Sequence, residues 1–242
     1  MIKEYGIQKN KYPTDFKLSV IMPAYNEEKT LNEIIKQVKS VDVPKEIIIV
    51  DDGSKDSTRK ILASIKDPEI KVLFNEKNMG KSYSVRRGIT HASGNIIIIQ
   101  DADLEYDPRE YHKLIKPILQ GKAKVVYGSR FPTRESRPSL FNKYFLGNRV
   151  LTHMSNILYN AGITDEPTCY KVFDANVLKS LNLKSMRFEF CPEVTAKVCK
   201  AGHKILEIPI SYSPRTVEEG KKINWRDGAQ GVWTLLKYRV VE

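Results

Sequence analysis

NIIIIQDADLE, residues 95–105, joins four consecutive isoleucines to three acidic side chains. A short and wholly apolar run is typical of a strand that is buried on both faces of a parallel sheet. A second run of this kind, Glu46–Val50, is followed directly by Asp51 and Asp52. In open α/β sheets, ligands bind beyond the carboxyl ends of the strands. The two runs therefore predict a sheet with acidic groups along one edge.

Strands and helices alternate through the first half of the chain. Further strands are predicted over Lys17–Pro23, Ile70–Phe74 and Ala123–Tyr127. Apolar residues at helical spacing predict helices over Glu27–Ser40, Asp56–Lys66 and Gly80–Ala92, with another that begins at Asp107. This alternation predicts parallel βαβ units, so the expected fold class is α/β, with a mostly parallel sheet flanked by helices.

The second half has two short strands, Cys169–Phe173 and Lys204–Ile210, and longer amphipathic helices. One helix is predicted over Ser139–Asn160, with an apolar stripe formed by Leu146, Val150, Met154 and Leu158. This stripe favours core packing, and a lipid-facing helix is the alternative. A last helix, which ends at Val241, mixes apolar and basic residues and fits a membrane surface and a protein core equally well.

Composition excludes several classes of protein. The 242 residues are 41% hydrophobic and 29% charged, which excludes a disordered chain. A membrane-spanning helix needs about 20 apolar residues, and none is predicted; nor is a signal peptide. Three cysteines without CxxC spacing support neither a zinc site nor a disulfide framework, so a cytoplasmic location is expected. The net charge of +11 suggests an anionic partner, which could be nucleic acid, a phosphorylated substrate or an anionic membrane.

Five carboxylates follow the predicted buried strands: Asp51, Asp52, Asp101, Asp103 and Glu105. Two unit charges 4 Å apart repel by about 4 kcal/mol near a protein surface, so such a cluster favours a bound cation. Asp101 and Asp103 are two residues apart in an extended segment and point the same way. Oxygen ligands without His or Cys suit Mg²⁺ or Mn²⁺, which proteins usually share with substrate phosphates. A solvated acidic loop is the alternative interpretation.

Four motifs resemble, in their order, those of glycosyltransferase family 2. They are Val20–Glu28, Ile49–Thr58, Asn78–Lys81 and Asp101–Glu105. The resemblance implies the GT-A fold, a Rossmann-like sheet that binds a nucleotide-sugar and a divalent metal. Further motifs resemble the polyprenyl-phosphate hexose synthases, such as dolichol-phosphate mannose synthase: Asp107-Pro108, Gly128–Arg130 and the segment from Arg215 to Lys221. One GT-A domain is expected over residues 1–242, with a nucleotide-sugar half over about 15–128 and an acceptor half over about 129–242.

The resemblance also implies roles for individual residues. Those that would contact the nucleoside are Pro23, Tyr25, Glu27, Val50 and Asp52. Those that would hold the metal and the diphosphate are Asp101, Ala102 and Asp103. Glu105 would be a third metal ligand, at a position where many members have Gln. Arg130 would contact a donor or acceptor phosphate, and Arg215 and Lys221 would close over the diphosphate, so that Asp103, Arg130, Arg215 and Lys221 form the catalytic set.

The expected reaction is metal-dependent transfer of a hexose, with inversion, to a polyprenyl or dolichyl monophosphate. GDP-mannose and UDP-glucose both fit the motifs as donors. Residues 121–150 hold seven Lys and Arg and one acid, so they could attract a lipid phosphate, with Arg130 and Arg149 as the expected ligands. Basic and amphipathic segments together predict peripheral attachment to the cytoplasmic face of a membrane.

Three other functions stay open at this point. A family 2 enzyme with a hydroxyl acceptor would need a carboxylate base, for which Asp165, Glu166 and Glu189 are available. Binding of nucleic acid is supported by the net charge alone, and the acidic edge would repel a phosphate backbone, so no nucleic-acid partner is expected. A nucleotidyltransferase would be expected to carry a Gly-rich basic loop after its first strand, where this chain has Pro23–Glu27.

Overall fold

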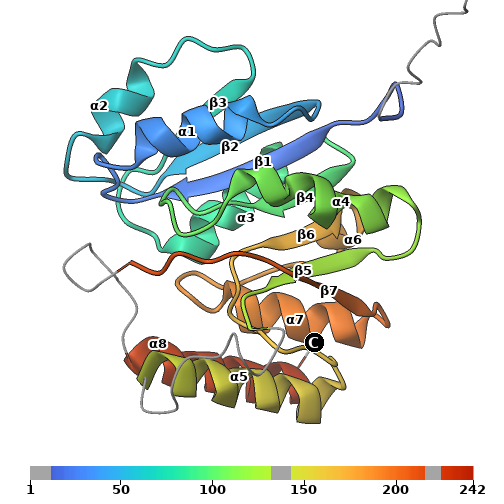
Figure 1. Ribbon diagram of the computed structural model, residues 1–242. Coiled ribbons are helices and arrows are strands. Elements are labelled where there is room, and N and C mark those ends of the chain that lie inside the picture. The colour runs from blue at the N-terminus through green and yellow to red at the C-terminus, as the bar shows by residue number, and fades with distance from the viewer. Residues whose placement is uncertain (1–11, 132–142, 216–224, 242) are drawn as a thin grey trace, which may run out of the picture.

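A seven-stranded sheet runs through the protein (Figure 1). The computed structural model describes residues 12–131, 143–215 and 225–241. The strands lie in the order β3-β2-β1-β4-β6-β5-β7. Their bounds are β1 Leu18–Ala24, β2 Lys45–Asp51, β3 Ile70–Phe74, β4 Ile96–Ile99, β5 Val125–Ser129, β6 Lys171–Asp174 and β7 Ile205–Pro209. The predicted strands agree with these within two residues at each end, and the predicted α/β fold class is confirmed.

Strand pairing brings the acidic motifs to one edge of the sheet. β1 pairs with β2 and with β4 in parallel, and the register places Ala24 beside Asp51 and Ile21 beside Ile99. The segments that follow these three strands therefore leave the sheet together. β6 is the exception to parallel pairing, because it lies antiparallel between β4 and β5.

Helices cover the sheet on both faces. Their bounds are α1 Leu31–Ser40, α2 Thr58–Ala63, α3 Lys81–His91, α4 Tyr111–Leu119, α5 Lys143–Tyr159, α6 Ala175–Ser180, α7 Phe190–Lys200 and α8 Trp225–Val240, with a short 3₁₀ helix η1 at Pro108–Glu110. In Figure 1, α1 and α4 lie on the near side of the sheet and α3 on the far side. The predicted helix start at Asp107 is confirmed, because its side chain accepts a hydrogen bond from the backbone N of Arg109. The short helix α6 was not predicted.

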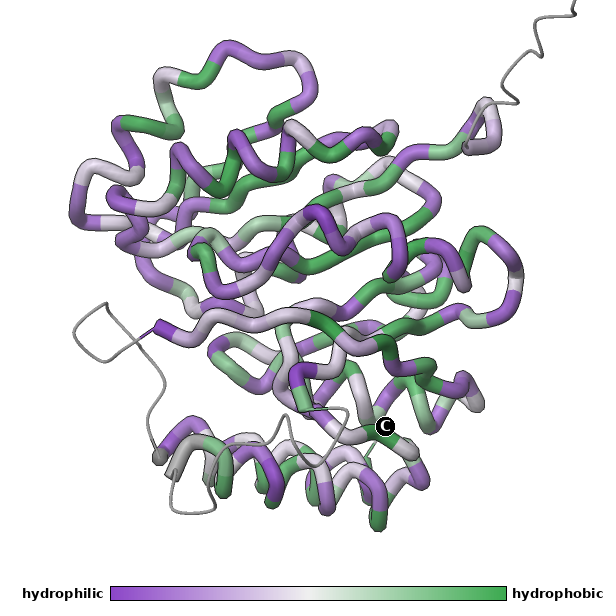
Figure 2. The backbone as a smooth tube through the Cα atoms, viewed as in Figure 1, coloured by the Kyte–Doolittle hydropathy of each residue, from purple (hydrophilic) through white to green (hydrophobic). Residues whose placement is uncertain are grey.

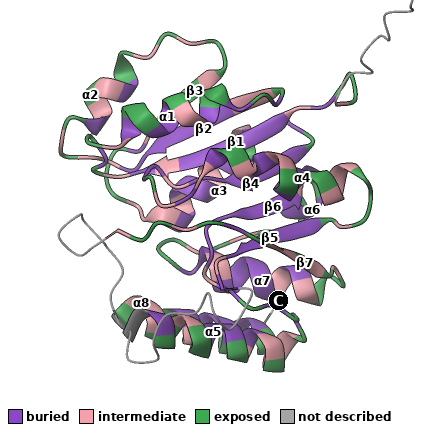
Figure 3. Ribbon diagram, in the orientation of Figure 1, coloured by how far each residue is buried: buried purple, intermediate pink, exposed green. Residues whose placement is uncertain are grey.

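The apolar residues of the two runs, at 47–50 and 96–99, lie in the hydrophobic core. Every residue of β4 is buried, as are Ile47–Val50 of β2 (Figure 3). The same strands are hydrophobic along their length in Figure 2. Burial on both faces explains why these strands show no alternation of apolar and polar residues.

The stripe predicted for the long helix does not form the core. In α5, Leu146 is 52% and Val150 is 45% exposed, whereas Leu151 and Ser155 on another face are buried against the protein. α5 packs side by side with α8, which has its own exposed apolar residues, Trp233 among them. The other two residues of the predicted stripe, Met154 and Leu158, are half-buried. The prediction that this stripe packs in the core was therefore wrong. Within the described residues, no helix has the length and apolar character needed to cross a membrane.

Candidate active site

The ends of β1, β2 and β4 and their following turns line a cavity of about 370 Å³. Two side-chain contacts hold these turns together: Thr58 Oγ1 accepts from the Glu27 backbone N at 2.8 Å, and Thr30 Oγ1 donates to the Ala102 carbonyl at 2.9 Å. The predicted residues that line the cavity are Pro23, Tyr25, Glu27, Asp52, Asp101, Ala102, Asp103, Glu105, Arg130 and Arg215. Residues from both halves of the chain therefore meet at one site.

Two predicted residues are not brought to this cavity, and a third lies outside the part of the chain that the structure describes. Val50 has no exposed surface and lies in the core of β2. Arg149 is exposed on α5 and does not line the cavity. Lys221 lies outside the described residues. So do Arg134 and Arg137, two of the basic residues of segment 121–150 that could attract anionic lipid.

Asp52 fixes the turn that precedes α3. Its Oδ1 accepts from the Met79 backbone N at 2.9 Å, and its Oδ2 accepts from the Gly80 backbone N at 2.8 Å. The Asn75 side chain donates to Oδ1 at 2.7 Å. The carboxylate is nearly buried and forms the floor of the cavity where the β2 and α3 segments meet.

Asp101 is paired with a lysine at the start of α3. Lys81 Nζ lies 2.6 Å from Asp101 Oδ1. Burial alone would raise the pKa of Asp101, but the Lys81 ammonium outweighs it and holds the pKa below its usual value. Asp101 therefore stays ionised, and a positive charge lies beside it in the cavity.

Asp103 is paired with an arginine that follows β7. Arg215 Nη2 lies 2.7 Å from Asp103 Oδ2, and Arg215 Nη1 lies 3.1 Å from Glu27 Oε2. Burial and the nearby Asp101 carboxylate raise the pKa of Asp103 to about 7, although Arg215 opposes this shift. Among the described residues, Arg215 Nε has no hydrogen-bond acceptor; it is shielded from solvent and lies 3.8 Å from Glu105 Oε1.

Arg130 is held rigidly in the lining of the cavity. Asp165 accepts from Arg130 Nε at 2.7 Å and from Nη2 at 2.8 Å, which is a bidentate pair. The guanidinium also lies 4.9 Å from the ring of Tyr212 and 5.2 Å from that of Phe131. Such packing fixes the direction in which the remaining N–H groups of Arg130 point.

The donor set of the cavity fits a divalent cation that is shared with a diphosphate. Across residues 12–131, 143–215 and 225–241, no three His, Cys, Asp or Glu side chains gather into a group that could hold a cation alone. Mg²⁺ needs only one or two carboxylates when substrate phosphates supply further oxygens. Asp101 and Asp103 are two carboxylates of this kind, and each is partnered here by a basic side chain.

Several residues of the cavity were missed as site residues. Lys81 is one of them, although its motif, Asn78–Lys81, was visible in the sequence. Phe188 is another, and its position depends on Gly80: with φ +97°, a Cβ at Gly80 would lie 2.4 Å from the Met186 carbonyl oxygen. That close approach lets the loop before α7 pack on the start of α3, which no local sequence signal indicates.

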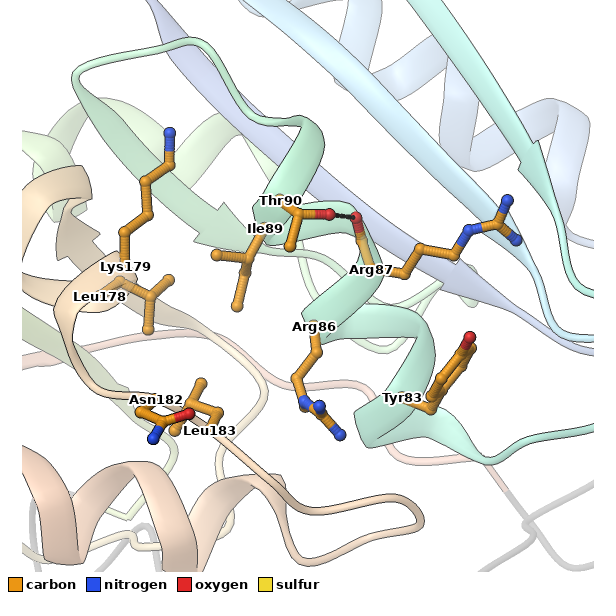
Figure 4. Close-up of a pocket in the computed structure, with 9 residues that line it drawn as sticks. All are labelled: Tyr83, Arg86, Arg87, Ile89, Thr90, Leu178, Lys179, Asn182 and Leu183. Carbon is orange, nitrogen blue, oxygen red and sulfur yellow. Dashed lines mark hydrogen bonds between the residues drawn. The ribbon is translucent and has the colours of Figure 1, made fainter.

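A second cavity, of about 350 Å³, lies between α3 and the end of α6 (Figure 4). It contains none of the predicted site residues. Its three basic side chains are bonded to backbone carbonyls: Arg86 to Lys184 and Ser185, Arg87 to Phe74, and Lys179 to Ala92. These bonds give the three side chains a structural role in joining neighbouring segments.

Comparison with known proteins identifies the family of the chain. The family model "Glycosyl transferase family 2" matches residues 19–181. A relative, the low-salt glycan biosynthesis hexosyltransferase Agl6 of Haloferax volcanii, is 31% identical over 93% of this chain. The chain spans about half of that relative's length, 53%.

Two further relatives are named for dolichyl phosphate. The dolichyl-phosphate beta-glucosyltransferase ALG5A of Trichomonas vaginalis is 28% identical, over 86% of this chain and 71% of its own length. The UDP-N-acetylglucosamine–dolichyl-phosphate N-acetylglucosaminyltransferase of Methanococcus voltae is 27% identical, over 84% of this chain and 89% of its own length.

The fold is also found in a solved structure. Glucosyl-3-phosphoglycerate synthase from Mycobacterium tuberculosis, in complex with Mn²⁺, UDP and phosphoglyceric acid, superimposes with a TM-score of 0.69. The alignment covers 94% of this chain and 80% of that one at 20% identity, so it establishes a shared fold. Together with the match of the family model over most of the sheet, this shows that the chain belongs to glycosyltransferase family 2.

Proposed function

We propose that this glycosyltransferase moves a hexose from a nucleotide-sugar to a polyprenyl monophosphate, with inversion and with Mg²⁺ or Mn²⁺. The dolichyl-phosphate relatives support this acceptor. The observation that carries the proposal is the composition of the cavity. Side chains suited to a metal-bound diphosphate, Asp101, Asp103, Lys81 and Arg215, line the same cavity as Arg130, which suits a second phosphate.

A hydroxyl acceptor would need a general base, and the positions of the three candidate carboxylates do not favour that role. Asp165 uses both oxygens to hold Arg130. Glu166 is completely buried, and Glu189 accepts from the Arg187 backbone N at 2.7 Å. None of the three lines the cavity. A lipid monophosphate needs no such base, because its second pKa is about 6 and it is largely a dianion at pH 7.

The chemistry then consists of positioning and charge neutralisation. A phosphate oxygen attacks the anomeric carbon, the bond from that carbon to the diphosphate breaks, and its electron pair stays on the leaving group. A divalent cation held by Asp101 and Asp103 would supply positive charge to the diphosphate. The positive charges of Lys81 and Arg215, which both line the cavity, would add to it at the position where negative charge grows during the reaction.

Arg130 would orient the acceptor. Its guanidinium is fixed by Asp165 and by two aromatic rings, so the N–H groups that face the cavity are already in place before a phosphate arrives. A preorganised donor loses little entropy on binding, which favours one orientation of the acceptor phosphate.

Exposed apolar residues support attachment to a membrane surface. Large apolar side chains stand out from α5 and α8: Leu146, Val150, Ile157, Trp233, Leu236 and Val240. Lys237 and Arg239 are exposed on α8 and would face anionic lipid head groups. Asn148 of α5 lines the cavity, so the same helix reaches both the proposed membrane face and the active site. Three free cysteines favour the reducing, cytoplasmic side.

The donor can be identified by thermal unfolding in the presence of nucleotide-sugars and Mn²⁺. We expect one of UDP-glucose, GDP-mannose and UDP-N-acetylglucosamine to raise the unfolding temperature more than the others, because a ligand that binds the folded state stabilises it by mass action. Asp103→Ala should remove the Mn²⁺-dependent part of that rise. If no nucleotide-sugar stabilises the protein at millimolar concentration, the proposed donor class is wrong.

A further inference from the structure

Residues 211–215 form an extended segment that follows β7 and lies along the turn after β4. The Ser211 backbone N donates to Glu110 Oε1 at 3.2 Å, and the Ser213 backbone N donates to the Glu105 carbonyl at 2.9 Å. In Figure 1 the chain leaves β7 and crosses towards the ends of the first strands. The segment thus connects β7, the edge strand of the sheet, to the cavity and places Arg215 there.

Glu105 accepts hydrogen bonds from this segment at several points along it. Its Oε1 accepts from the Arg215 backbone N at 2.8 Å, and its Oε2 accepts from the Tyr212 hydroxyl at 3.2 Å. With its carbonyl bonded to Ser213, Glu105 contacts three of the five residues. Its side chain is only 14% exposed, so these bonds are shielded from water.

The same residue is tied to the carboxylate that Arg215 contacts. The Glu105 backbone N donates to Asp103 Oδ1 at 3.1 Å, while Arg215 Nη2 lies 2.7 Å from Asp103 Oδ2. Arg215 is therefore held at its backbone by Glu105 and at its guanidinium by Asp103. Because both oxygens of Glu105 accept hydrogen bonds from segment 211–215, its carboxylate faces that segment.

We propose that Glu105 is a positioning residue for Arg215. It holds segment 211–215 so that the guanidinium enters the cavity at Asp103, and it acts on transfer through Arg215. The catalytic part of this proposal rests on the proposed function. A carboxylate suits the role because it accepts from an N–H and an O–H at once and places negative charge 3.8 Å from Arg215 Nε.

Amide hydrogen exchange at Arg215 tests the anchoring directly, since this N–H bonds to Glu105 Oε1. In Glu105→Ala we expect exchange at Arg215 to be about tenfold faster than in the wild type. Glu110→Ala is the matched control, because Glu110 contacts only Ser211 in the same segment, and it should leave Arg215 unchanged. Glu105→Gln keeps one carbonyl oxygen and should restore most of the protection. Unchanged exchange at Arg215 in Glu105→Ala would overturn the proposal.

Two further measurements separate positioning from direct metal binding. If Glu105 acts through Arg215, then Glu105→Ala lowers kcat, and adding it to Arg215→Ala lowers kcat no further. Affinity for Mn²⁺ in the presence of UDP or GDP should change by less than about threefold in Glu105→Ala and fall by more than about tenfold in Asp103→Asn. Equal losses of Mn²⁺ affinity would assign Glu105 to the metal and contradict the proposal. The exchange experiment needs neither donor nor acceptor, so it stands even if the proposed reaction is wrong.

Discussion

The guanidinium of Arg215 lies 2.7 Å from the carboxylate of Asp103, although the two residues are 112 positions apart in the chain. This pair joins the segment after β7 to the turn after β4. It also places a positive charge on a carboxylate that we propose as a metal ligand. The two charges needed to stabilise a leaving diphosphate, one from the protein and one from a cation, would thus converge on Asp103.

Replacing Arg215 should have opposite effects on catalysis and on cation binding. Arg215→Ala removes a donor to the leaving diphosphate, so kcat should fall about 10²-fold. It also removes positive charge beside Asp103, so Mn²⁺ affinity should rise, by about threefold. Steady-state kinetics and Mn²⁺ titration measure the two effects. Arg109→Ala is the control, since Arg109 is exposed and pairs with Asp107. Weaker Mn²⁺ binding in Arg215→Ala would show that the guanidinium does not compete with the cation.

Arg130 and Arg149 should differ in their effect on the acceptor. Arg130→Lys keeps the charge but loses the bidentate pair with Asp165, so KM for the polyprenyl phosphate should rise about tenfold. Donor affinity should stay close to that of the wild type. Arg149→Lys should change little, because Arg149 does not line the cavity. A larger effect from Arg149 would place the acceptor phosphate on α5 instead.

Membrane attachment should depend on the exposed side chains of α5 and α8. Ile157 is 67% and Trp233 is 65% exposed, so replacing both by Ser should weaken binding to anionic vesicles about tenfold without loss of fold. Co-sedimentation measures the binding, and Leu206→Ser on β7, at another exposed apolar position, is the control. Salt at 1 M should release part of the wild-type protein, because it screens charges beyond about 3 Å. Equal binding by the double variant and the control would mean that another surface attaches the protein.

Glu166 should make stability depend on pH. Burial, opposed by the charge of Lys171, raises the pKa of this carboxyl in the folded state. Because the pKa is higher in the folded than in the unfolded protein, the neutral carboxyl favours the folded state at pH values below the unfolded pKa, near 4.3. This contribution to stability is lost as the pH rises towards the folded pKa. Glu166→Gln cannot ionise, so its stability relative to wild type should increase between pH 4 and pH 7. Urea unfolding at several pH values measures the difference, and a difference independent of pH would contradict this account.

Short-range sequence signals were enough to predict the sheet and its acidic edge. The runs at β2 and β4 are apolar throughout because both faces of these strands are covered, and the acidic residues come directly after them. The parallel register then brings Asp52 and Asp101 to the same edge. Such a result needs only local sequence and the geometry of parallel pairing.

The outward stripe of α5 could not be predicted from periodicity. Both Leu146 and Phe145 belong to apolar sets at helical spacing, and only the second is buried. Beside apolar residues such as Leu151, the buried side of the α5–α8 pair carries small polar residues, such as Thr152 and Thr234. Their hydroxyls bond to the carbonyl of the residue four positions earlier. A hydroxyl satisfied in this way can be buried, so the apolar pattern alone does not tell which side faces the protein.

Ion pairs between distant segments could not be predicted either. The family resemblance implied that Arg130 and Arg215 would contact phosphates. It gave no sign that Asp165 holds the first and that Asp103 and Glu105 hold the second, because these partners are 35 to 112 residues away. Tertiary packing decides such contacts, and the antiparallel insertion of β6 between β4 and β5 is part of that packing.

The most direct test of the proposed function compares polyprenyl phosphate with the matching polyprenol as acceptors. Both are incubated with Mn²⁺ and a radiolabelled nucleotide-sugar, and label is counted in the organic phase. We predict transfer to the phosphate alone, with loss of transfer in Asp103→Ala and in excess EDTA. Equal labelling of the polyprenol would contradict the account, because it would require a general base and a hydroxyl acceptor in place of a lipid phosphate.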